Sequence, residues 1–435
     1  MKSSDNAQNI QWFRDAAPYI NQHRGKTFVL YFSGAAVASP EFDHLIHDIG
    51  LLHALGIRLV LVHGARPQIE ARLQLENIAP DYAEGLRITN IESLDAVLEA
   101  TGRLRVIIEA KLSLSLTNTP MSGSKIRVCS GNFITAKPLG IRNGVNFQHT
   151  GAVRKVDSTA IQQLLDAGQC VLFSPVGYSP SGEVFNLRAE QVAGETAIAL
   201  SADKLIILHD SDSIPDLPAQ LTPQDITPRQ KAALSAELQK DLECAVHAVN
   251  GGVGRAHLID RFSDGSLLRE LFTRDGSGTL ISSGHYEDLR QARSHDVGGI
   301  LELIRPMEQQ GILLRRSREQ LELEIKHFIV MERDGLIAGC AALFPYKKDQ
   351  MGEIACIAIH PAYRGTGRGD TLLKYLEKKA REQGLQQVFV MSTQTMHWFI
   401  ERGFSEQSLD NLPVEKATLY NYQRKSLIFM KPLSN

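Results

Sequence analysis

The chain has 435 residues, of which 43% are hydrophobic and 22% are charged, and its formal net charge is -2. This is the composition of a soluble globular protein, and the length exceeds what one core usually holds, so we expect two or three domains. A net charge this close to zero gives no electrostatic reason to expect nucleic acid or an anionic membrane as a partner.

The five cysteines are widely spaced, and no segment has the apolar length of a membrane span or a signal peptide. The absence of a CxxC pair predicts a cytoplasmic protein without a disulfide framework or a metal site. No carboxylate or cysteine ligand is pre-arranged with the histidines at 44, 47 and 53 to hold a metal ion, so we interpret them as structural.

Strand and helix patterns alternate through the first part of the chain. Residues 8–23 have helical spacing, 26–37 form an apolar strand with a small-residue turn, 41–56 are helical, and 57–73 contain a strand, a turn and a helix. This order requires a right-handed parallel crossover and predicts an α/β fold. After a proline-rich loop, a long helix is predicted over 229–249.

Glycine and serine then accumulate before a new helical pattern, so we place a domain boundary at Gly284. The sequence thus divides into 1–284, a three-layer α/β/α domain, and 285–435, an α+β domain. The second domain is predicted to contain helices over 296–311, 317–326, 368–383 and 396–402, and strands over 327–333, 336–344, 353–360, 386–392 and 426–431.

The loop "RGTGRG", residues 364–369, lies between a strand and an amphipathic helix. Glycines let backbone N–H groups approach an anion closely, and the helix that follows presents its positive N-terminal end. Arg364 and Arg368 add charge-assisted hydrogen bonds. The spacing matches neither a P-loop nor a dinucleotide fingerprint, so the predicted ligand is another phosphate group.

This loop after "CIAIHPAYRG" resembles motif A of the GCN5-related N-acetyltransferases (GNAT), and "HWFIERGF" resembles their second signature. The resemblance covers 285–435 and implies an acetyl-CoA site. It implies that the diphosphate meets the N–H groups of 364–369 and that the strand before the loop flanks the pantetheine and thioester. The cofactor-binding residues are then Cys356, Ile357, Ala358, Ile359, Arg364, Gly365, Thr366, Gly367, Arg368 and Gly369.

Acetyl transfer to an amine needs a base for the ammonium, an oxyanion site and an acid for the leaving thiolate. Glu353, the only carboxylate on the strand before the loop, is the predicted base, acting directly or through water. The tyrosine that many family members use as the acid is Phe399 here, so Ser392 is the first candidate, with Thr393 or solvent as alternatives.

Dibasic pairs occur in "GILLRRSREQ", "FPYKKDQ" and "NYQRKS". If they meet near the thioester, they suit an acceptor with two carboxylates, because arginine binds carboxylate in a bidentate manner. If they do not meet, each pair is simply solvated. The predicted acceptor-binding residues are Arg316, Lys347, Cys356, Arg424 and Ser426.

The first domain resembles the amino-acid kinase family in "VLYFSGAAV", "LVLVHGARPQI", "GLRIT" and "GEVFNLRAEQVAGETAIALSADKLIILHD". Tyr31 and Ser33 stand where such kinases have the lysine and the first glycine of one turn, and Ala65 and Arg66 replace two glycines of the next. Phosphoryl transfer depends on positioning and charge neutralisation, so we expect a kinase fold without kinase activity.

A kinase-like domain ahead of an acetyltransferase domain is similar to the N-acetylglutamate synthase family. The resemblance implies acetyl transfer from acetyl-CoA to the α-amino group of L-glutamate, as the first step of arginine biosynthesis. It also implies feedback inhibition by L-arginine and a homo-hexamer held together partly by the N-terminal helix. The implied arginine site consists of Tyr19, His257, Glu270, Gly276 and Ser277.

Three alternatives remain open from the sequence. The chain could be a bifunctional enzyme that keeps acetylglutamate kinase activity, a non-catalytic arginine-sensing regulator, or an acetyltransferase for protein lysines.

Overall fold

The structure, a computed structural model, describes residues 2–114, 121–211, 217–273, 276–283, 288–333, 336–365, 367–418, 420 and 426–433. It divides into two compact units, Met1–His285 and Tyr286–Asn435. Gly284, where the sequence places the boundary, lies outside the described residues.

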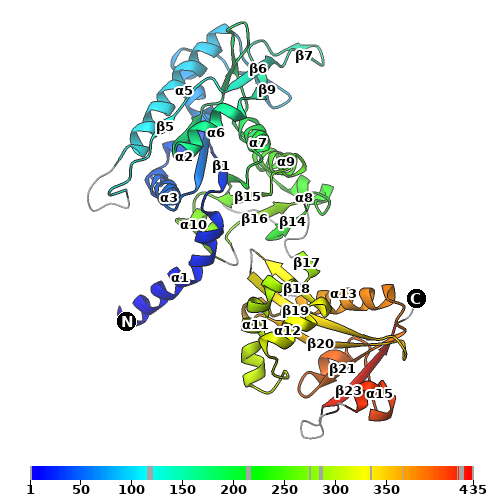
Figure 1. Cartoon of the computed structure of the whole chain (residues 1–435). Helices are drawn as coiled ribbons and strands as arrows, with labels where there is room; N and C mark the ends of the chain where they lie inside the picture. Colours follow the sequence, from blue (N-terminus) through cyan, green and yellow to red (C-terminus); the bar gives the residue numbers. More distant parts are fainter. Residues whose placement is uncertain are drawn as a thin grey trace. The chain divides into compact units, whose positions relative to one another are not determined.

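The first unit is built around an eight-stranded sheet in the order β14-β16-β15-β13-β1-β2-β10-β5 (Figure 1). Its strands, in that order, are Gln220–Leu221, Thr279–Ser282, Arg255–Asp260, Lys204–His209, Thr27–Phe32, Arg58–His63, Cys170–Phe173 and Val128–Cys129. The inner strands are parallel, and β16 runs antiparallel to β15.

Smaller pairings border this sheet. They are a four-stranded sheet of β12 (Val184–Asn186), β11 (Val176–Tyr178), β6 (Ile134–Pro138) and β9 (Gly151–Val156), and the hairpins β3 (Asp81–Ala83) with β4 (Leu86–Ile88) and β7 (Ile141–Arg142) with β8 (Val145–Asn146).

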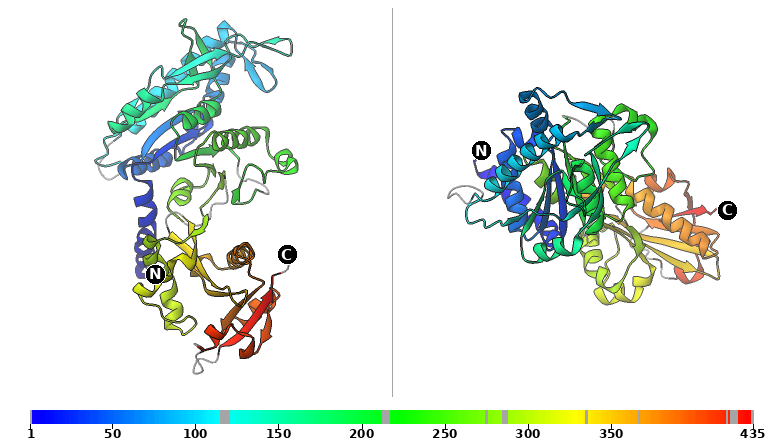
Figure 2. Two further views of the ribbon diagram at one scale, coloured as in Figure 1. Left: turned by 45° about the vertical axis from the view of Figure 1, so that its right-hand side comes forward. Right: turned by 90° about the horizontal axis from the view of Figure 1, so that it is seen from above.

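Helices cover both faces of the large sheet, which gives the three-layer α/β/α architecture (Figure 2). They are α1 (Lys2–His23), α2 (Gly34–Ala38), α3 (Phe42–Ala54), α4 (Arg66–Leu75), α5 (Ile91–Leu112), α6 (Ser158–Asp166), α7 (Ala189–Ala199), α8 (Pro228–Ala233), α9 (Ala236–Asn250) and α10 (Ser266–Phe272). Side chains alternate along β1, so Phe28 and Leu30 pack with α3 and α5 while Val29 packs with α7 and α9.

The predicted helix over 229–249 is wrong as a single element. Leu234 is extended, with ψ 151°, and therefore ends α8. The hydroxyl of Ser235 then accepts a hydrogen bond from the N–H of Leu238 and caps α9. A serine side chain can replace the missing helical partner of such an N–H group, which lets a second helix begin here.

The second unit contains a seven-stranded sheet in the order β17-β18-β19-β20-β21-β23-β22. In that order the strands are Asp288–Gln291, Phe328–Arg333, Leu336–Tyr346, Met351–Ile359, Gln387–Ser392, Leu427–Pro432 and Ser405–Gln407. The helices are α11 (Val297–Gln309), α12 (Arg318–Glu324), α13 (Arg368–Glu382), α14 (Met396–Ile400) and α15 (Val414–Ala417), with single 3-10 turns at Ser294–Asp296, Ile325–His327, Pro361–Tyr363 and Leu409–Asn411.

Two cores hold this sheet, one on each face. Helices α11 and α12 pack with Phe328 and Val330 on one face, and α13 packs with Ile329 and Met331 on the other (Figure 1). The strand predicted over 353–360 begins earlier, at Met351, so Glu353 lies inside it.

Strands β20 and β21 are parallel neighbours that pair over only three residues. The pairing runs from Met351 with Gln387 to Glu353 with Phe389. β20 then continues to Ile359 without a further pair to β21 among the described residues. The two strands therefore separate, and backbone N–H and C=O groups of β20 face the opening between them. Such groups need partners, which makes the opening a binding place.

A bulge lies at the same point of β20. Cys340 pairs with Ala358 and Ala342 with Ala355, so two residues of β20 stand opposite Ala341. Cys356, the first of those two, has a φ of 55°, in the left-handed region. This conformation is rare for a residue with a side chain, and bulges re-aim the neighbouring groups. The bulge turns β20 where the opening begins.

The left-handed backbone makes position 356 sensitive to side-chain shape. We expect Cys356→Ala to be tolerated. Cys356→Val adds a branched Cβ at positive φ, so its free energy of unfolding should be roughly 1–3 kcal/mol lower than that of the alanine variant. Cys340→Val is the control, because Cys340 is equally buried but not among the residues with positive φ. Thermal unfolding of the full chain should separate the two valine variants; equal losses would contradict the argument.

Candidate active site

The glycine loop follows β20 and leads into α13. Gly365 and Gly367 have φ values of 82° and 78°, and a Cβ at either would meet no atom within 4 Å. Both glycines therefore serve the backbone conformation and leave the approach to the N-terminus of α13 open. Gly367 is the N-cap of α13, and the N–H groups of the first helical turn can donate to an anion. Thr366 lies outside the described residues.

Arginine side chains brace this loop. Arg364 Nε donates to the carbonyl of Ile359 at 3.2 Å, and the guanidinium of Arg368 lies over the Tyr363 ring, 5.1 Å from its centroid. Both cations thus remain beside the loop. The predicted residues Ile357, Ala358 and Ile359 lie on the separated part of β20 that leads into it.

Gly369 has a different role from its neighbours. A Cβ there would lie 3.0 Å from Cζ2 of Trp398, so the glycine allows α14 to pack against the first turn of α13. Arg402 stacks on the Trp398 ring at 4.1 Å and forms a two-nitrogen ion pair with Asp370. That hydrogen-bonded pair lowers the pKa of Asp370. The second family signature therefore fixes the start of α13.

Glu353 lies where β20 and β21 separate. Its side chain is 9% exposed, and Lys416 Nζ lies 2.7 Å from its Oε1. The Tyr346 hydroxyl donates to Oε2 at 3.3 Å. Burial and the charge of Glu353 raise the pKa of Tyr346. Sequence reasoning missed both partners. Tyr346 is five residues before Met351, where β20 begins, but Lys416 lies far along the chain and has no local signal.

Ser392 ends β21 on the other side of the opening. Its Oγ accepts from the N–H of Thr395 at 3.1 Å and shares a hydrogen bond with Thr395 Oγ1 at 2.8 Å. If the Thr395 hydroxyl donates in that pair, the Ser392 hydroxyl is available to donate elsewhere. Ser392 also pairs with Leu427 of β23, so Ser426 comes directly beside it.

The predicted acceptor-binding residues are placed unequally. Arg316 is 12% exposed, with Nε 3.5 Å from Glu324 Oε2. A hydrogen bond from Cys340 and, to a lesser extent, the positive charge of Arg316 lower the pKa of the Cys356 thiol. The guanidinium of Arg316 is therefore a cation near the bulge. Lys347 is exposed in the turn between β19 and β20. Arg424 lies outside the described residues.

The predicted arginine-site residues of the first unit lie together. His257 Nδ1 is 2.6 Å from Glu270 Oε1, and Lys204 Nζ is 3.4 Å from His257 Nε2. A charged ammonium can only donate, so Nε2 accepts and Nδ1–H donates to Glu270. Burial and the Lys204 charge lower the pKa of His257 to about 4, which keeps the ring neutral.

Backbone N–H groups complete the partners of Glu270. The N–H groups of Ser277 and Gly278 donate to Oε2 at 2.6 and 2.9 Å. Although burial raises it, these bonds and His257 lower the pKa of Glu270 to about 2. Oε2 thus has two donors and Oε1 has one, which leaves Oε1 a free lone pair for a cationic ligand.

The remaining predicted residues surround this carboxylate. Gly276 has a φ of 66°, and a Cβ there would lie 2.5 Å from Glu270 Oε2, so only glycine fits. Tyr19 is on α1 and packs against the core beneath α10. The His23 ring holds α1 to α10 by a 2.8 Å hydrogen bond to the Leu271 carbonyl. Lys204 is the residue that sequence reasoning missed.

The two turns that differ from the kinase pattern line a cavity of about 520 Å³ in the first unit. Ser33 caps the short α2 by accepting from the N–H of Ala36, so the turn is already occupied by its own side chain. Arg66 is held by Glu70 at 3.0 Å and by Glu237 at 3.3 Å. Side chains with partners of their own therefore occupy the two turns where the kinase pattern has glycines that bind phosphate through backbone N–H groups.

Charged side chains of both signs line this cavity: Glu70, Glu190, Asp210, Glu237 and Asp241 with Arg66, Arg87, Arg188, Lys240 and Arg261. Burial and the charges of Glu190, Asp241 and Asp210 raise the pKa of Tyr31. Burial and two of those neighbours, Glu190 and Asp210, also raise the pKa of Asp241. Tyr31, which stands where such kinases have a lysine, is therefore buried among carboxyl groups.

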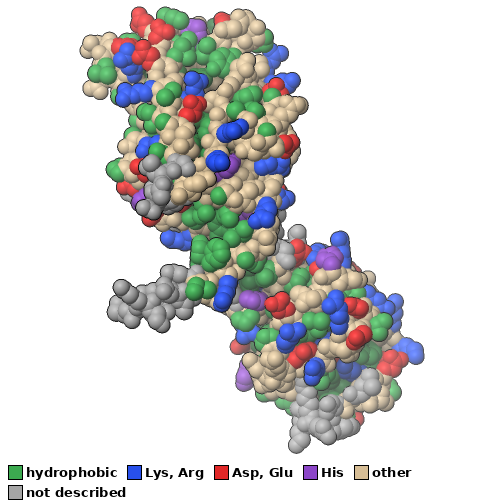
Figure 3. All heavy atoms as spheres, turned by 60° about the vertical axis from the view of Figure 1, so that its left-hand side comes forward, with side chains coloured by type: hydrophobic (Ala, Val, Ile, Leu, Met, Phe, Trp, Pro, Cys, Tyr) green, Lys and Arg blue, Asp and Glu red, His purple; other side chains and the backbone are tan. Residues whose placement is uncertain are grey.

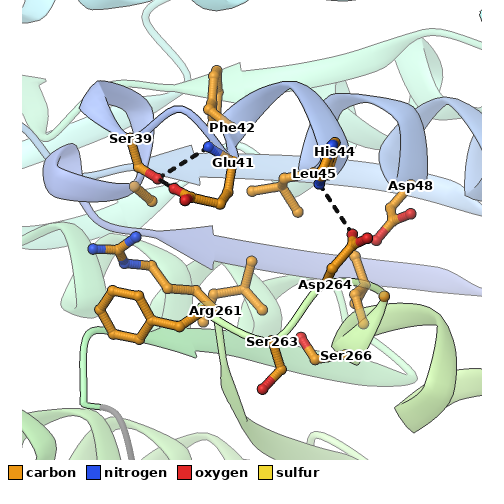
Figure 4. Close-up of a pocket in the computed structure, with 15 residues that line it drawn as sticks. Ser39, Glu41, Phe42, His44, Leu45, Asp48, Arg261, Ser263, Asp264 and Ser266 are labelled. Carbon is orange, nitrogen blue, oxygen red and sulfur yellow. Dashed lines mark hydrogen bonds and ion pairs between the residues drawn. The ribbon is translucent and has the colours of Figure 1, made fainter.

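A small pocket of about 40 Å³ lies where α3 meets the start of α10 (Figure 4). His44 Nδ1 is 3.2 Å from Asp264 Oδ1, and Asp48 points toward the same aspartate. Burial and the Asp264 charge raise the pKa of Asp48 to about 7. Sequence reasoning missed the pair of His44 with Asp264, because the two residues are 220 positions apart in the chain. Among the described residues, no group of three or more His, Cys, Asp and Glu is arranged to hold a metal ion.

Comparison with known proteins matches both units. The amino acid kinase family matches residues 26–225, and the acetyltransferase (GNAT) family matches 299–404. An amino-acid acetyltransferase of Ectopseudomonas mendocina is 50% identical over 429 residues, 98% of this chain and 99% of that protein. One of Pseudomonas fluorescens SBW25 is also 50% identical over 429 residues, with the same coverage.

Solved structures match over the same length. N-acetylglutamate synthase from Neisseria gonorrhoeae, complexed with coenzyme A and L-arginine, is 40% identical, with a TM-score of 0.90 over 98% of this chain and 99% of that one. The same enzyme complexed with coenzyme A and N-acetyl-glutamate has a TM-score of 0.62 over the same shares of the two chains.

None of the helices in the described part of this chain combines the length and the hydropathy that a membrane span requires.

The Asp48 carboxyl predicts a pH dependence of stability. Because its pKa is higher in the folded state than in the unfolded state, its contribution is fully present at low pH and is lost as pH rises toward about 7. The free energy of unfolding of Asp48→Asn, relative to that of wild type, should therefore rise by about 1–2 kcal/mol between pH 5 and pH 8.5. This figure is reduced to allow for the partial exposure of Asp48. Thermal unfolding at both pH values measures this, and Asp95→Asn on the exposed face of α5 should show no such change. An advantage that does not grow with pH would contradict the assignment.

Proposed function

The chain belongs to the amino-acid acetyltransferase family, and from that premise we propose that it transfers the acetyl group of acetyl-CoA to the α-amino group of L-glutamate. That it is an acetyl-CoA-dependent acetyltransferase follows from the relatives and the GNAT domain. The observation that carries the finer proposal is the opening between β20 and β21, which has Glu353 and Ser392 on its sides and the glycine loop at its end.

Acetyl-CoA would bind by its diphosphate at the N-terminus of α13. The N–H groups of the 364–369 loop and the side chains of Arg364 and Arg368 offer donors there. The unpaired backbone of β20 beyond Glu353 offers partners for the amide groups of pantetheine. The bulge at Cys356 sets how that backbone is turned toward the thioester.

Glu353 would take the proton of the acceptor's ammonium group, directly or through one water. The freed amine attacks the thioester carbonyl carbon, the C–N bond forms, the nitrogen releases its second proton to solvent, and the C–S bond breaks. The leaving thiolate then takes a proton from the Ser392 hydroxyl, which solvent restores. A positioned base typically contributes about 10²–10⁴-fold to such a rate.

Glutamate suits the acceptor side because it brings two carboxylates and an amine. Arg316 supplies a nearly buried guanidinium beside the bulge, and Ser426 comes next to Ser392. We include Arg424 and Lys347 as further cations on the strength of the sequence. The complex of the Neisseria enzyme with coenzyme A and N-acetyl-glutamate supports a product of this kind.

We further propose that L-arginine inhibits the enzyme by binding between α1 and α10 and contacting Glu270 and Tyr19. A guanidinium fits the free lone pair of Glu270 Oε1, and the Neisseria complex with L-arginine supports the ligand. Feedback of this kind would place the reaction at the start of arginine synthesis.

The hexamer and the cytoplasmic location remain part of the same proposal. Ile10, Trp12 and Phe13 of α1 are 54%, 46% and 64% exposed, and Figure 3 shows hydrophobic surface where the described part of α1 joins its unit. Apolar exposure on a helix is consistent with a contact between copies of the chain.

The kinase alternative is disfavoured by the carboxyl groups around Tyr31, where a kinase has a lysine, and by the contacts that hold Arg66. A regulator without catalysis and a protein-lysine acetyltransferase remain alternatives that the assays below separate, by CoA release with free glutamate and with a lysine peptide as acceptors.

We expect the purified chain to release CoA from acetyl-CoA with L-glutamate, and Glu353→Gln to lose on the order of 10²-fold or more in kcat. The variant should still bind acetyl-CoA, because the glycine loop does not contact Glu353. Release is followed with a thiol reagent, and binding is measured by calorimetry. Near-normal turnover in Glu353→Gln would remove it from the mechanism, and absence of release by wild type would refute the proposed function.

L-arginine should slow CoA release by wild type. Glu270→Gln should need roughly 10–100-fold more arginine for half inhibition, because a charged hydrogen bond in a buried site contributes about 1.5–3 kcal/mol. Glu243→Gln, an exposed carboxylate on α9, is the matched control. Arginine titrations of the two variants that superimpose would exclude Glu270 from the site.

A further inference from the structure

We propose that Lys416 is a positioning residue that holds Glu353 as an oriented carboxylate where β20 and β21 separate. The inference rests on the proposed function, in which Glu353 is the base. It concerns a residue that comes from another element, 63 positions later in the chain.

The contact is close and shielded from solvent. Lys416 Nζ is 2.7 Å from Glu353 Oε1, and the two side chains are 17% and 9% exposed. The Tyr346 hydroxyl takes one position on Oε2. Each carboxylate oxygen therefore has one fixed donor and keeps one lone pair, which is enough to accept a proton from an amine or a water.

The backbone that carries Lys416 is anchored independently of the ion pair. Leu412 is buried in a cluster with Phe389 and Met430, and Ala417 and Tyr420 pack against the same cluster. Phe389 is also the residue of β21 that pairs with Glu353. The segment that carries Lys416 thus packs against β21, the strand next to Glu353. Apolar packing therefore holds Lys416 near Glu353 even without the ion pair.

The charged and titratable groups around Glu353 are few. β19 contributes Tyr346, β21 contributes the apolar Phe389, and α15 contributes Lys416 with Glu415 next to it. Glu415 is 69% exposed and is paired at 3.7 Å with Lys348. Lys416 is therefore the cation that the described part of the chain places against the buried carboxylate.

The physical need for such a cation follows from burial. A buried carboxylate without a partner cation favours its protonated form, and a protonated Glu353 cannot accept the proton of the acceptor. A lysine at 2.7 Å opposes that tendency and fixes the direction of Oε1. Lys416 is expected to act on the rate only through Glu353.

The experiment is the pH profile of kcat/KM for CoA release with L-glutamate. In Lys416→Met the acid-side midpoint should move to higher pH, because the opposite charge that favours an ionised carboxylate is removed. Activity should be lost most near neutral pH and partly regained at alkaline pH. Lys416→Arg keeps the charge and should keep the midpoint near that of wild type.

Lys348→Met is the matched control, because it removes the same charge from a neighbouring exposed position, 90% exposed. It should leave the profile in place. Acetyl-CoA binding and thermal unfolding of each variant show whether the fold survives. If Lys416→Met unfolds, Lys416→Gln, which retains a donor and most of the volume, is used in the same comparison.

A double-mutant cycle tests whether Lys416 acts through Glu353. Adding Lys416→Met to Glu353→Gln should cause no further loss of kcat/KM, because the base is already gone. Losses that multiply, or a Lys416→Met or Lys416→Gln profile with an unmoved acid-side midpoint, would overturn the inference. Such results leave the acetyltransferase activity of wild type in place, whereas a wild type without CoA release refutes the proposed function itself.

Discussion

The second unit depends on the separation of two parallel strands. β20 and β21 pair only as far as Glu353 and Phe389, and from there β20 continues alone on that side within the described chain. A strand with free N–H and C=O groups inside a folded unit requires a partner. The bulge at Cys356 directs those groups, and the open turn at Gly365 and Gly367 lies at the end of the same strand. The proposed cofactor, base and acid positions all lie around this one departure from regular pairing.

Both proposed sites solve the problem of a buried carboxylate in the same chemical way. Glu353 receives an ammonium and a hydroxyl, and Glu270 receives an imidazole N–H and two backbone N–H groups. Both oxygens of Glu353 and one oxygen of Glu270 keep a lone pair for a further donor. The difference is the charge of the partner: the cation beside Glu353 is in direct contact, whereas Lys204 reaches Glu270 only through the neutral His257.

Much of this could be predicted from the sequence, because motifs with local spacing carry their own structure. The α/β and α+β classes, the GNAT loop and the changed kinase turns are all local patterns. The contacts of Lys416 and Lys204 could not be predicted, because they join elements far apart in the chain. The break at Leu234 was missed for a different reason: its apolar spacing suits a helix, and only the Ser235 cap interrupts it. Thr366 and Arg424 lie outside the described residues, so their roles stay predictions.

The changed turns of the first unit limit what one substitution can restore. Tyr31 lies on β1, Ser33 caps one helix, and Arg66 opens another with its own carboxylate partners. A lysine placed at position 31 would lie near Glu190, Asp241 and Asp210, while Ser33 and Arg66 kept their present contacts. Three positions on three different elements would therefore have to change together before the open glycine turns of the kinase pattern could form.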